Sequence, residues 1–129
     1  MSEVVLITGS STGIGRVLCE RALAQGQQVV ALSRRGSGLS HDRLHELSVD
    51  LADAAATAQA AAEVARRFEV CRFVHNAGSI RPALLADVQP DDLATLSQLH
   101  LGSAITLMQA VLPGMRTRRF GRVVFIGSR

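Results

Sequence analysis

A glycine-rich turn near the start of the chain has the residue types and spacing to bind a phosphate group. It reads Thr8-Gly9-Ser10-Ser11-Thr12-Gly13-Ile14-Gly15 and directly follows an apolar run. Glycines let the backbone come close to a pyrophosphate, whose charge would be stabilised by free N–H groups and the positive end of a following helix. Ser10, Ser11 or Thr12 could donate further hydrogen bonds. A purely structural turn is the alternative, but the strand before and the helix after are what nucleotide binding requires.

The elements that would position this turn are short apolar runs that alternate with helix-like segments. Uninterrupted runs rich in β-branched residues favour parallel strands covered on both faces. These runs span residues 4–7, 29–32, 47–49, 73–74 and 123–126. Helices are expected over about 13–25, 53–67 and 91–115. We therefore predict one α/β domain over residues 1–129: a Rossmann-type, doubly wound parallel sheet with helices on both faces and strand order 3-2-1-4-5.

The spacing Thr-Gly-three-Gly-Ile-Gly in this turn resembles the glycine motif of classical short-chain dehydrogenases/reductases. Three further segments match that family in the same order along the chain: Asp50-Leu51, Asn76-Ala77-Gly78 and the run 121–128. Together the matches cover nearly the whole chain, which resembles the N-terminal, cofactor-binding half of the family. Ser79-Ile80-Arg81-Pro82 also resembles the corresponding segment of sepiapterin-reductase-like enzymes.

The resemblance implies an oxidoreductase that transfers hydride between a nicotinamide cofactor and a carbonyl or alcohol substrate. Where a member preferring NAD(H) carries an acidic residue for the ribose 2′-hydroxyl, this chain has Ser33, Arg34 and Arg35. Serine and guanidinium groups can bind a 2′-phosphate, so we expect NADP(H) to be favoured over NAD(H). Alternatively, the two arginines only solvate a loop. Arg16 either assists them or lies on solvated helix surface.

Two further segments of the cofactor site are implied by the resemblance. Asp50 matches the aspartate that contacts the adenine amino group, with Leu51 beside the ring. Capping of the following alanine-rich helix is an equal alternative for Asp50. Asn76, Ala77 and Gly78 match the segment that stabilises the central sheet and lines the cofactor ribose; His75 replaces an asparagine often found before it.

Ser128 and His100 are the candidates for catalysis. Ser128 matches the family serine that positions and polarises the substrate carbonyl, and ligands of doubly wound sheets bind at the carboxyl ends of the strands. A turn serine is the alternative. His100 stands where the family has an asparagine that helps to hold a proton-relay water. Histidine can donate and accept, so His100 either serves the relay or is a core histidine on the inward-facing stripe of the third helix.

The family's general acid, a tyrosine with a lysine four positions further on, is missing here, because the 129 residues contain neither tyrosine nor lysine. A fifth strand left as a bare apolar edge would also be an aggregation hazard. We therefore expect a fragment or a truncated gene product that ends before the later strands and is inactive alone. The alternative function is a non-catalytic NADP-binding fragment or pseudoenzyme; a structural protein without a ligand would leave the glycine turn unexplained.

Composition argues against several other classes of function. The net charge is +3, but the arginines are scattered and the only aromatic residues are four phenylalanines, so we expect no nucleic-acid partner. No leader and no apolar run of membrane-spanning length is present, which predicts a soluble, cytoplasmic protein. Cys19 and Cys71 lack metal-ligand spacing, so we expect buried free thiols and no metal site. The family resemblance implies that a complete chain forms a homodimer or tetramer through its long helix.

Overall fold

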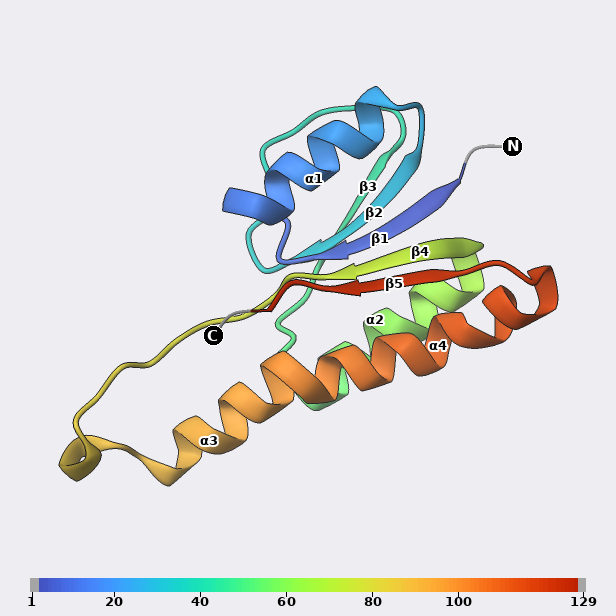
Figure 1. The fold of residues 1–129 in the computed structure, drawn as a ribbon. Coiled ribbons are helices and arrows are strands. Elements are labelled where there is room, and N and C mark those ends of the chain that lie inside the picture. Colours follow the sequence, from blue (N-terminus) through green and yellow to red (C-terminus); the bar gives the residue numbers. More distant parts are fainter. Residues whose placement is uncertain (1–2, 128–129) are drawn as a thin grey trace.

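A computed structural model describes residues 3–127, which form a five-stranded parallel sheet with helices on both faces (Figure 1). The strands are β1 (Val4–Thr8), β2 (Gln28–Ser33), β3 (Leu44–Ser48), β4 (Val70–His75) and β5 (Arg122–Phe125). Their order is β3-β2-β1-β4-β5, which confirms the predicted fold class and strand order. The helices are α1 (Gly13–Ala24), α2 (Ala54–Arg67), α3 (Pro90–Ser97) and α4 (Ser103–Arg118).

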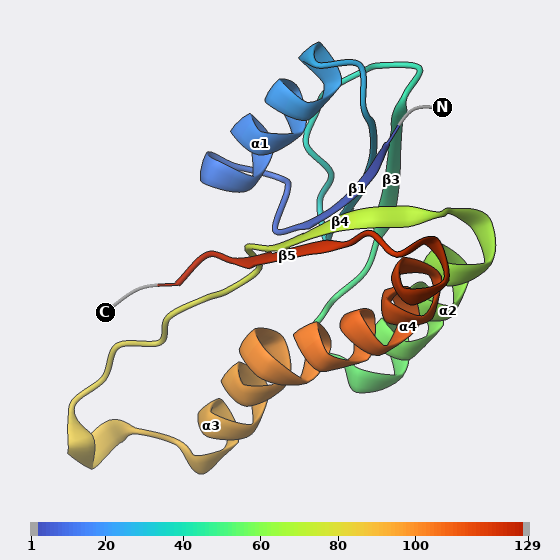
Figure 2. The ribbon, with the colours of Figure 1, turned by 45° about the vertical axis from the view of Figure 1, so that its right-hand side comes forward.

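The central strands are buried because helices cover both faces of the sheet. Figure 2 shows α1 on one face, and α2 and α4 together on the other. All five residues of β1 are buried, and their side chains alternate between two cores. Leu6 packs with Phe73 and Leu107 on the α2–α4 side, whereas Ile7 packs with Cys19 on the α1 side. Burying each such side chain contributes roughly 2 kcal/mol, which fixes the sheet beneath the glycine turn.

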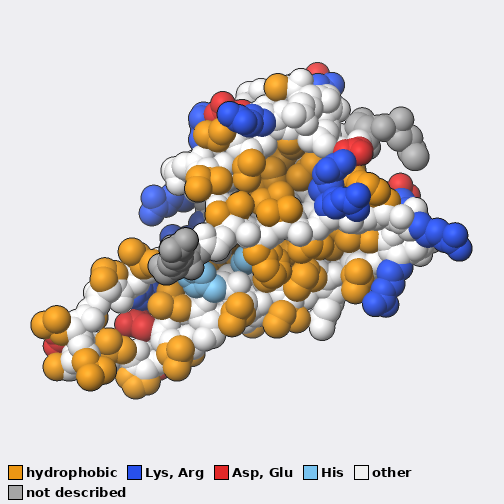
Figure 3. Space-filling view, viewed as in Figure 1, with side chains coloured by type: hydrophobic (Ala, Val, Ile, Leu, Met, Phe, Trp, Pro, Cys, Tyr) orange, Lys and Arg blue, Asp and Glu red, His pale blue; other side chains and the backbone are white. Residues whose placement is uncertain are grey.

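The two edge strands differ from the prediction that every strand is covered on both faces. All four residues of β5 are exposed, including Val123 and Val124, because α1 packs on β1 and β2 and α4 packs on β4, so that neither helix covers a face of β5. Figure 3 shows the resulting apolar surface between α1 and the lower helices. At the other edge, β3 begins at Leu44 rather than near residue 47, and its polar residues lie outward. An edge strand needs apolar side chains on only one of its faces, so a run of consecutive hydrophobic residues is a poor indicator of where such a strand begins and ends.

The long third helix is also less regular than predicted. It begins at Pro90 and is interrupted by a π-helical turn at Gln98–Gly102 before α4 starts. The predicted inward stripe holds in α4, where Ala104, Leu107 and Val111 are buried, but Leu93 in α3 is 72% exposed. A 3-10 turn, Leu85–Asp87, precedes α3. Figure 1 shows the reason for this difference, because α3 extends past the sheet and therefore has no strand beside it to pack on.

The first helix, α1, packs on the sheet through one face. Its buried residues are Gly15, Cys19, Ala22 and Leu23. Ile14 is 58% exposed. Gly15 makes the contact where the helix meets the glycine turn, because only a residue without a side chain fits there.

Features that would suggest other chemistry are few in residues 3–127. Cys19 and Cys71 are buried free thiols, as predicted. No three histidine, cysteine or acidic side chains of this part of the chain lie close enough together to hold a metal ion. Within the same residues, none of the helices combines the length and the apolar character needed to cross a bilayer.

Candidate functional site

The glycine turn leaves β1 at the carboxyl edge of the sheet and enters α1 without a side-chain cap. Gly9 has a φ of +68°, and a Cβ there would lie 2.9 Å from the backbone of Ala77. A Cβ on Gly15 would collide with the carbonyl oxygen of Gly9. Thr12 is the N-cap residue, but its side chain makes no capping hydrogen bond. The first N–H groups of α1 are therefore open to an anion, and the backbone can be approached closely.

The three hydroxyls of the turn have different surroundings. Ser11 lines the cleft described below, and Thr12 is exposed at the start of α1. Ser10 is fully buried, does not line the cleft, and its Oγ has no hydrogen-bond partner among residues 3–127. The structure therefore brings Ser11, but not Ser10, into the wall of the cleft, and Thr12 lies exposed outside that wall.

A cleft of about 140 Å³ lies beside this turn, at the carboxyl ends of β1, β2 and β4. Most of the predicted cofactor-binding residues meet in its wall. The lining residues are Gly9, Ser11, Leu32, Ser33, Arg34, Val49, Asp50, Leu51, Ala77, Gly78 and Leu99. Charge, backbone N–H groups and apolar surface come together there, which is the combination that a dinucleotide needs. The residues present therefore fit such a cofactor.

A larger cavity, about 410 Å³, lies at the opposite, amino edge of the sheet, between the ends of α2 and α4. Its lining includes Arg67 and Arg118. Arg67 already pairs with Glu63 at 2.8 Å, and Arg118 donates to the carbonyl oxygen of Val70 at 2.6 Å. Because its cations have partners and no helix begins there, we place the functional site at the carboxyl edge despite the smaller volume.

Thr8 joins the glycine turn to the end of β4. Its buried Oγ1 accepts hydrogen bonds from the backbone N–H groups of Asn76 and Ala77, each at 3.0 Å. Its hydroxyl proton is then available for Nδ1 of His75, also at 3.0 Å. The Asn76 side chain completes the link by donating from Nδ2 to the Gly9 carbonyl oxygen at 3.1 Å. The glycine motif and the asparagine motif therefore form one unit.

These bonds also fix the ring of His75, whose role the sequence did not reveal. Since Nδ1 accepts from Thr8, Nε2 carries the proton and donates to the backbone carbonyl oxygen of His100 at 3.1 Å. Burial is the main cause that lowers the pKa of His75 below its usual value of 6.5. The neutral ring thus connects β1 and β4 to the π-helical turn before α4. Only its place before the asparagine motif could have drawn attention to it.

His100 is exposed, so the core-histidine alternative is wrong. Its Nε2 lies 2.8 Å from the carbonyl oxygen of Ser79 and 3.1 Å from the Ser79 nitrogen. The ring donates to the former or accepts from the latter, depending on its tautomer. A Cβ on Gly78 would lie only 2.6 Å from the ring. The structure therefore brings His100 next to the asparagine motif, at the border of the cleft.

The residues predicted to surround the adenosine part of a cofactor lie at the ends of β2 and β3. Arg34 is exposed and lines the cleft, while Ser33 is buried and its Oγ accepts from the N–H of Gly36 at 3.0 Å. Leu51 is buried in the cleft wall. Asp50 also lines the cleft, but the cap of α2 is Asp53, which accepts from the N–H of Ala56. The capping alternative for Asp50 is therefore wrong.

Ser128 lies outside the described residues. The described chain approaches it along β5 and beyond, where the N–H of Ile126 donates to the carbonyl oxygen of His75 at 3.0 Å. This segment therefore runs beside the end of β4, on the same edge of the sheet as the cleft.

Comparison with known proteins adds an independent finding. Residues 3–129 match the family model described as short chain dehydrogenase. The chain is 32% identical over 133 residues to 3-oxoacyl-(acyl-carrier-protein) reductase FabG of Salmonella typhimurium, covering 98% of this chain and 54% of the relative. It is 33% identical over 129 residues to the reductase MabA of Mycobacterium avium, covering 99% of this chain and 50% of that protein. It therefore spans about half the length of these relatives.

Solved structures agree with this match. A short-chain dehydrogenase from Streptomyces avermitilis superposes with a TM-score of 0.89 at 34% identity, covering 98% of this chain and 49% of that one. A 3-oxoacyl-(acyl-carrier-protein) reductase from Agrobacterium tumefaciens with NADP bound superposes with a TM-score of 0.85 at 32% identity, covering 98% of this chain and 52% of the other.

Proposed function

This chain belongs to the short-chain dehydrogenase family, and we propose that it forms the NADP(H)-binding part of an oxidoreductase acting on a carbonyl or alcohol substrate. One observation carries the proposal: the glycine turn, Arg34 and the asparagine motif meet in a single cleft at the carboxyl edge of the sheet. Residues 1–129 would then constitute one NAD(P)-binding domain. Bound NADP(H) supplies hydride chemistry at its nicotinamide ring.

Each wall of the cleft has a proposed role in holding the cofactor. The N–H groups at the start of α1, with Ser11 and Thr12, would hold the pyrophosphate. Arg34 would pair with the 2′-phosphate; its guanidinium has no ion pair within the described chain. Asp50 and Leu51 would contact the adenine. The fixed segment 76–78 would line the ribose.

The catalytic roles are proposals for Ser128 and His100. Ser128 would donate a hydrogen bond to the substrate oxygen and so orient the carbonyl. His100 would hold a relay water at the edge of the cleft, because its ring is exposed and carries both donor and acceptor capacity. The residues of this chain therefore bind and orient, and a tyrosine–lysine pair elsewhere in a longer protein would supply the proton. A cofactor with a 2′-phosphate favours carbonyl reduction, as the names of the reductase relatives also suggest.

A non-catalytic NADP-binding module is the second candidate. The 129 residues contain neither tyrosine nor lysine, so they bind and orient in both proposals and do not themselves supply the family's proton donor. The reading frame downstream of the codon for Arg129 separates the two functions. A frame that continues and encodes tyrosine followed four positions later by lysine supports the enzyme, whereas an immediate stop codon supports the module.

Self-association through α4 is proposed for the complete protein. Ile105 and Leu112 are exposed and lie seven residues, about two helical turns, apart on this helix. Their shared outer face would pack against a second copy in a homodimer or tetramer. The cytoplasmic location and the resemblance to sepiapterin-reductase-like enzymes stay predictions from the sequence.

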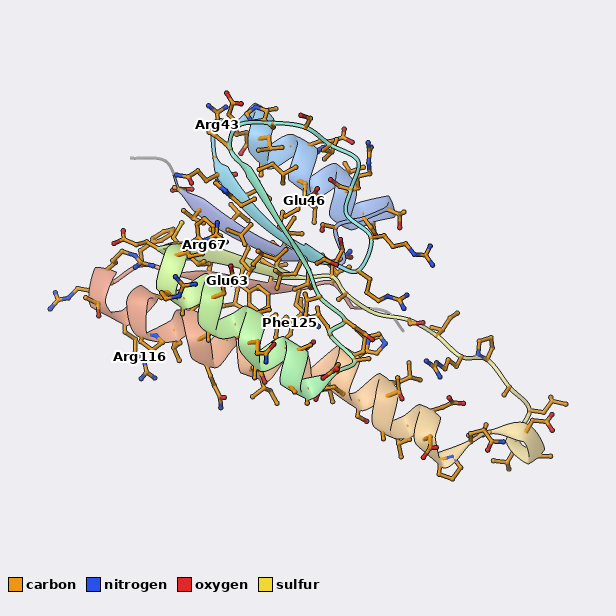
Figure 4. All side chains as sticks on the ribbon, turned by 180° about the vertical axis from the view of Figure 1, so that it is seen from behind. Arg43, Glu46, Glu63, Arg67, Arg116 and Phe125 are labelled. Carbon is orange, nitrogen blue, oxygen red and sulfur yellow. The ribbon has the colours of Figure 1, made fainter. Side chains whose placement is uncertain are left out.

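The variant Arg34→Ala tests the proposed cofactor. We expect the Kd for NADPH to rise by at least about tenfold, because a charge-assisted pair with the 2′-phosphate is lost, while the Kd for NADH stays unchanged. Arg116→Ala is the matched control, since it removes one positive charge from the far end of α4 (Figure 4). Equal affinities of Arg34→Ala and the unmodified protein for NADPH would contradict the assignment.

A further inference from the structure

The loop that carries Arg34 and Arg35 is anchored to the rest of the domain by side chains outside the cleft. Its central anchor is Ser37, which is buried although the loop lies at the surface. Oε1 of Glu46 accepts from the backbone N–H of Ser37 at 2.7 Å and from its hydroxyl at 2.5 Å. Glu46 comes from β3, and Figure 4 shows it on the side of the sheet that α1 covers.

The same residue is held from α1. Nε of Arg16 donates to the carbonyl oxygen of Ser37 at 2.9 Å, and Nη1 of Arg16 pairs with Glu20 at 2.6 Å, which orients the guanidinium. Both backbone polar groups and the hydroxyl of Ser37 therefore have partners on two different elements. Arg16 lies one residue after Gly15, so it connects the loop to the helix that begins in the glycine turn.

Further bonds hold the loop close to Arg34 itself. The carbonyl oxygen of Arg34 accepts from the hydroxyl of Ser48 at 3.0 Å. The N–H of Gly36 donates to the hydroxyl oxygen of Ser33, also at 3.0 Å. The backbone around Arg34 is thus fixed at several points. Its exposed guanidinium, by contrast, forms no ion pair within residues 3–127.

We propose that Arg16 and Glu46 are positioning residues that set the preference for NADP(H) by holding Ser37, and with it the Arg34 loop, at a fixed distance from the glycine turn. The inference rests on the proposed function and deepens it. A cofactor with a 2′-phosphate must contact the start of α1 and Arg34 at once. Fixing the loop against α1 avoids the entropy cost of ordering a flexible arginine when the phosphate binds. NADH lacks the 2′-phosphate, so it gains nothing from a fixed loop.

The test is a double-mutant cycle read by nucleotide fluorescence on the purified protein. Glu46→Ala should raise the Kd for NADPH about tenfold, the size expected for loss of a positioning hydrogen bond, and leave the Kd for NADH within about twofold. In an Arg34→Ala background, Glu46→Ala should add nothing to the loss of NADPH affinity. Glu63→Ala is the matched control, because it removes an exposed carboxylate that pairs with an arginine on α2.

Arg16→Met provides the same test by a milder change, because methionine keeps the aliphatic part of the side chain. It replaces Glu46→Ala in the cycle if that variant fails to fold. Equal weakening of NADPH and NADH, or effects that add to Arg34→Ala, would overturn the positioning role and leave only a structural one. If Arg34→Ala raises the Kd for NADPH but Glu46→Ala and Arg16→Met leave it unchanged, this inference alone is overturned. An Arg34→Ala variant that binds NADPH normally would overturn the proposed 2′-phosphate site, and this inference with it.

Discussion

Replacing Thr8 by valine should destabilise the protein far more than one lost hydroxyl would suggest. Valine keeps the shape of threonine, but the buried Oγ1 that serves three partners at 3.0 Å disappears. The N–H groups of Asn76 and Ala77 lose their acceptor, and Nδ1 of His75 loses its donor. With about 1 kcal/mol for each half-buried group left unpaired, the free energy of unfolding should fall by about 3 kcal/mol.

Urea unfolding followed by far-ultraviolet circular dichroism measures this loss, because the chain has no tryptophan or tyrosine for intrinsic fluorescence. The melting temperature should drop by about 10 °C. Thr8→Ser is the control; it keeps the hydroxyl and should lose about 1 kcal/mol for the missing methyl group. A Thr8→Val protein within about 0.5 kcal/mol of the unmodified one would refute the idea that Thr8 joins the two motifs.

Three further predictions follow from buried polar groups. Ser10→Ala should raise the free energy of unfolding by about 1 kcal/mol in urea titrations, because it removes a buried hydroxyl without a partner; a loss of nucleotide affinity would instead show that Ser10 serves the ligand. Because the pKa of His75 is lowered in the folded protein, the unfolded chain takes up a proton on this ring at a higher pH than the folded one. The free energy of unfolding should therefore fall as the pH drops from about 7.5 to about 5.5, and it should fall less in His75→Gln. Burial raises the pKa of Cys19 to about 11, so a thiol reagent at neutral pH should label it only after unfolding, and rapid labelling of the native protein would contradict this.

The sequence was sufficient to predict the sheet and to predict which of its edges carries the candidate site. Strand order followed because parallel strands alternate with helices and cross over with one hand. The glycine turn, Arg34 and the asparagine motif each follow a strand, and the carboxyl ends of parallel strands meet at one edge. The positions of the motifs and the topology of the sheet therefore both predict that the candidate site lies at the carboxyl edge.

Contacts between residues distant in the sequence could not be predicted. His75 and His100 looked like isolated departures from a pattern, but they bridge β4 and the turn before α4 through backbone groups. Hydrophobic periodicity also could not show where α3 leaves the sheet, because the same stripe is buried at Leu107 and exposed at Leu93. The sequence could not exclude Asp50 as the cap of the alanine-rich helix, because only the observed start of α2 shows that Asp53 is the cap.

The most direct test of the proposed function is a titration of the purified protein with NADPH and with NADH, with circular dichroism as the check that it is folded. Selective binding of NADPH, tighter than NADH by at least about tenfold, is the result we predict from the guanidinium of Arg34, which lines the cleft and forms no ion pair within residues 3–127. A folded protein that binds neither nucleotide, or binds both equally well, would contradict the assignment of this cleft to NADP(H).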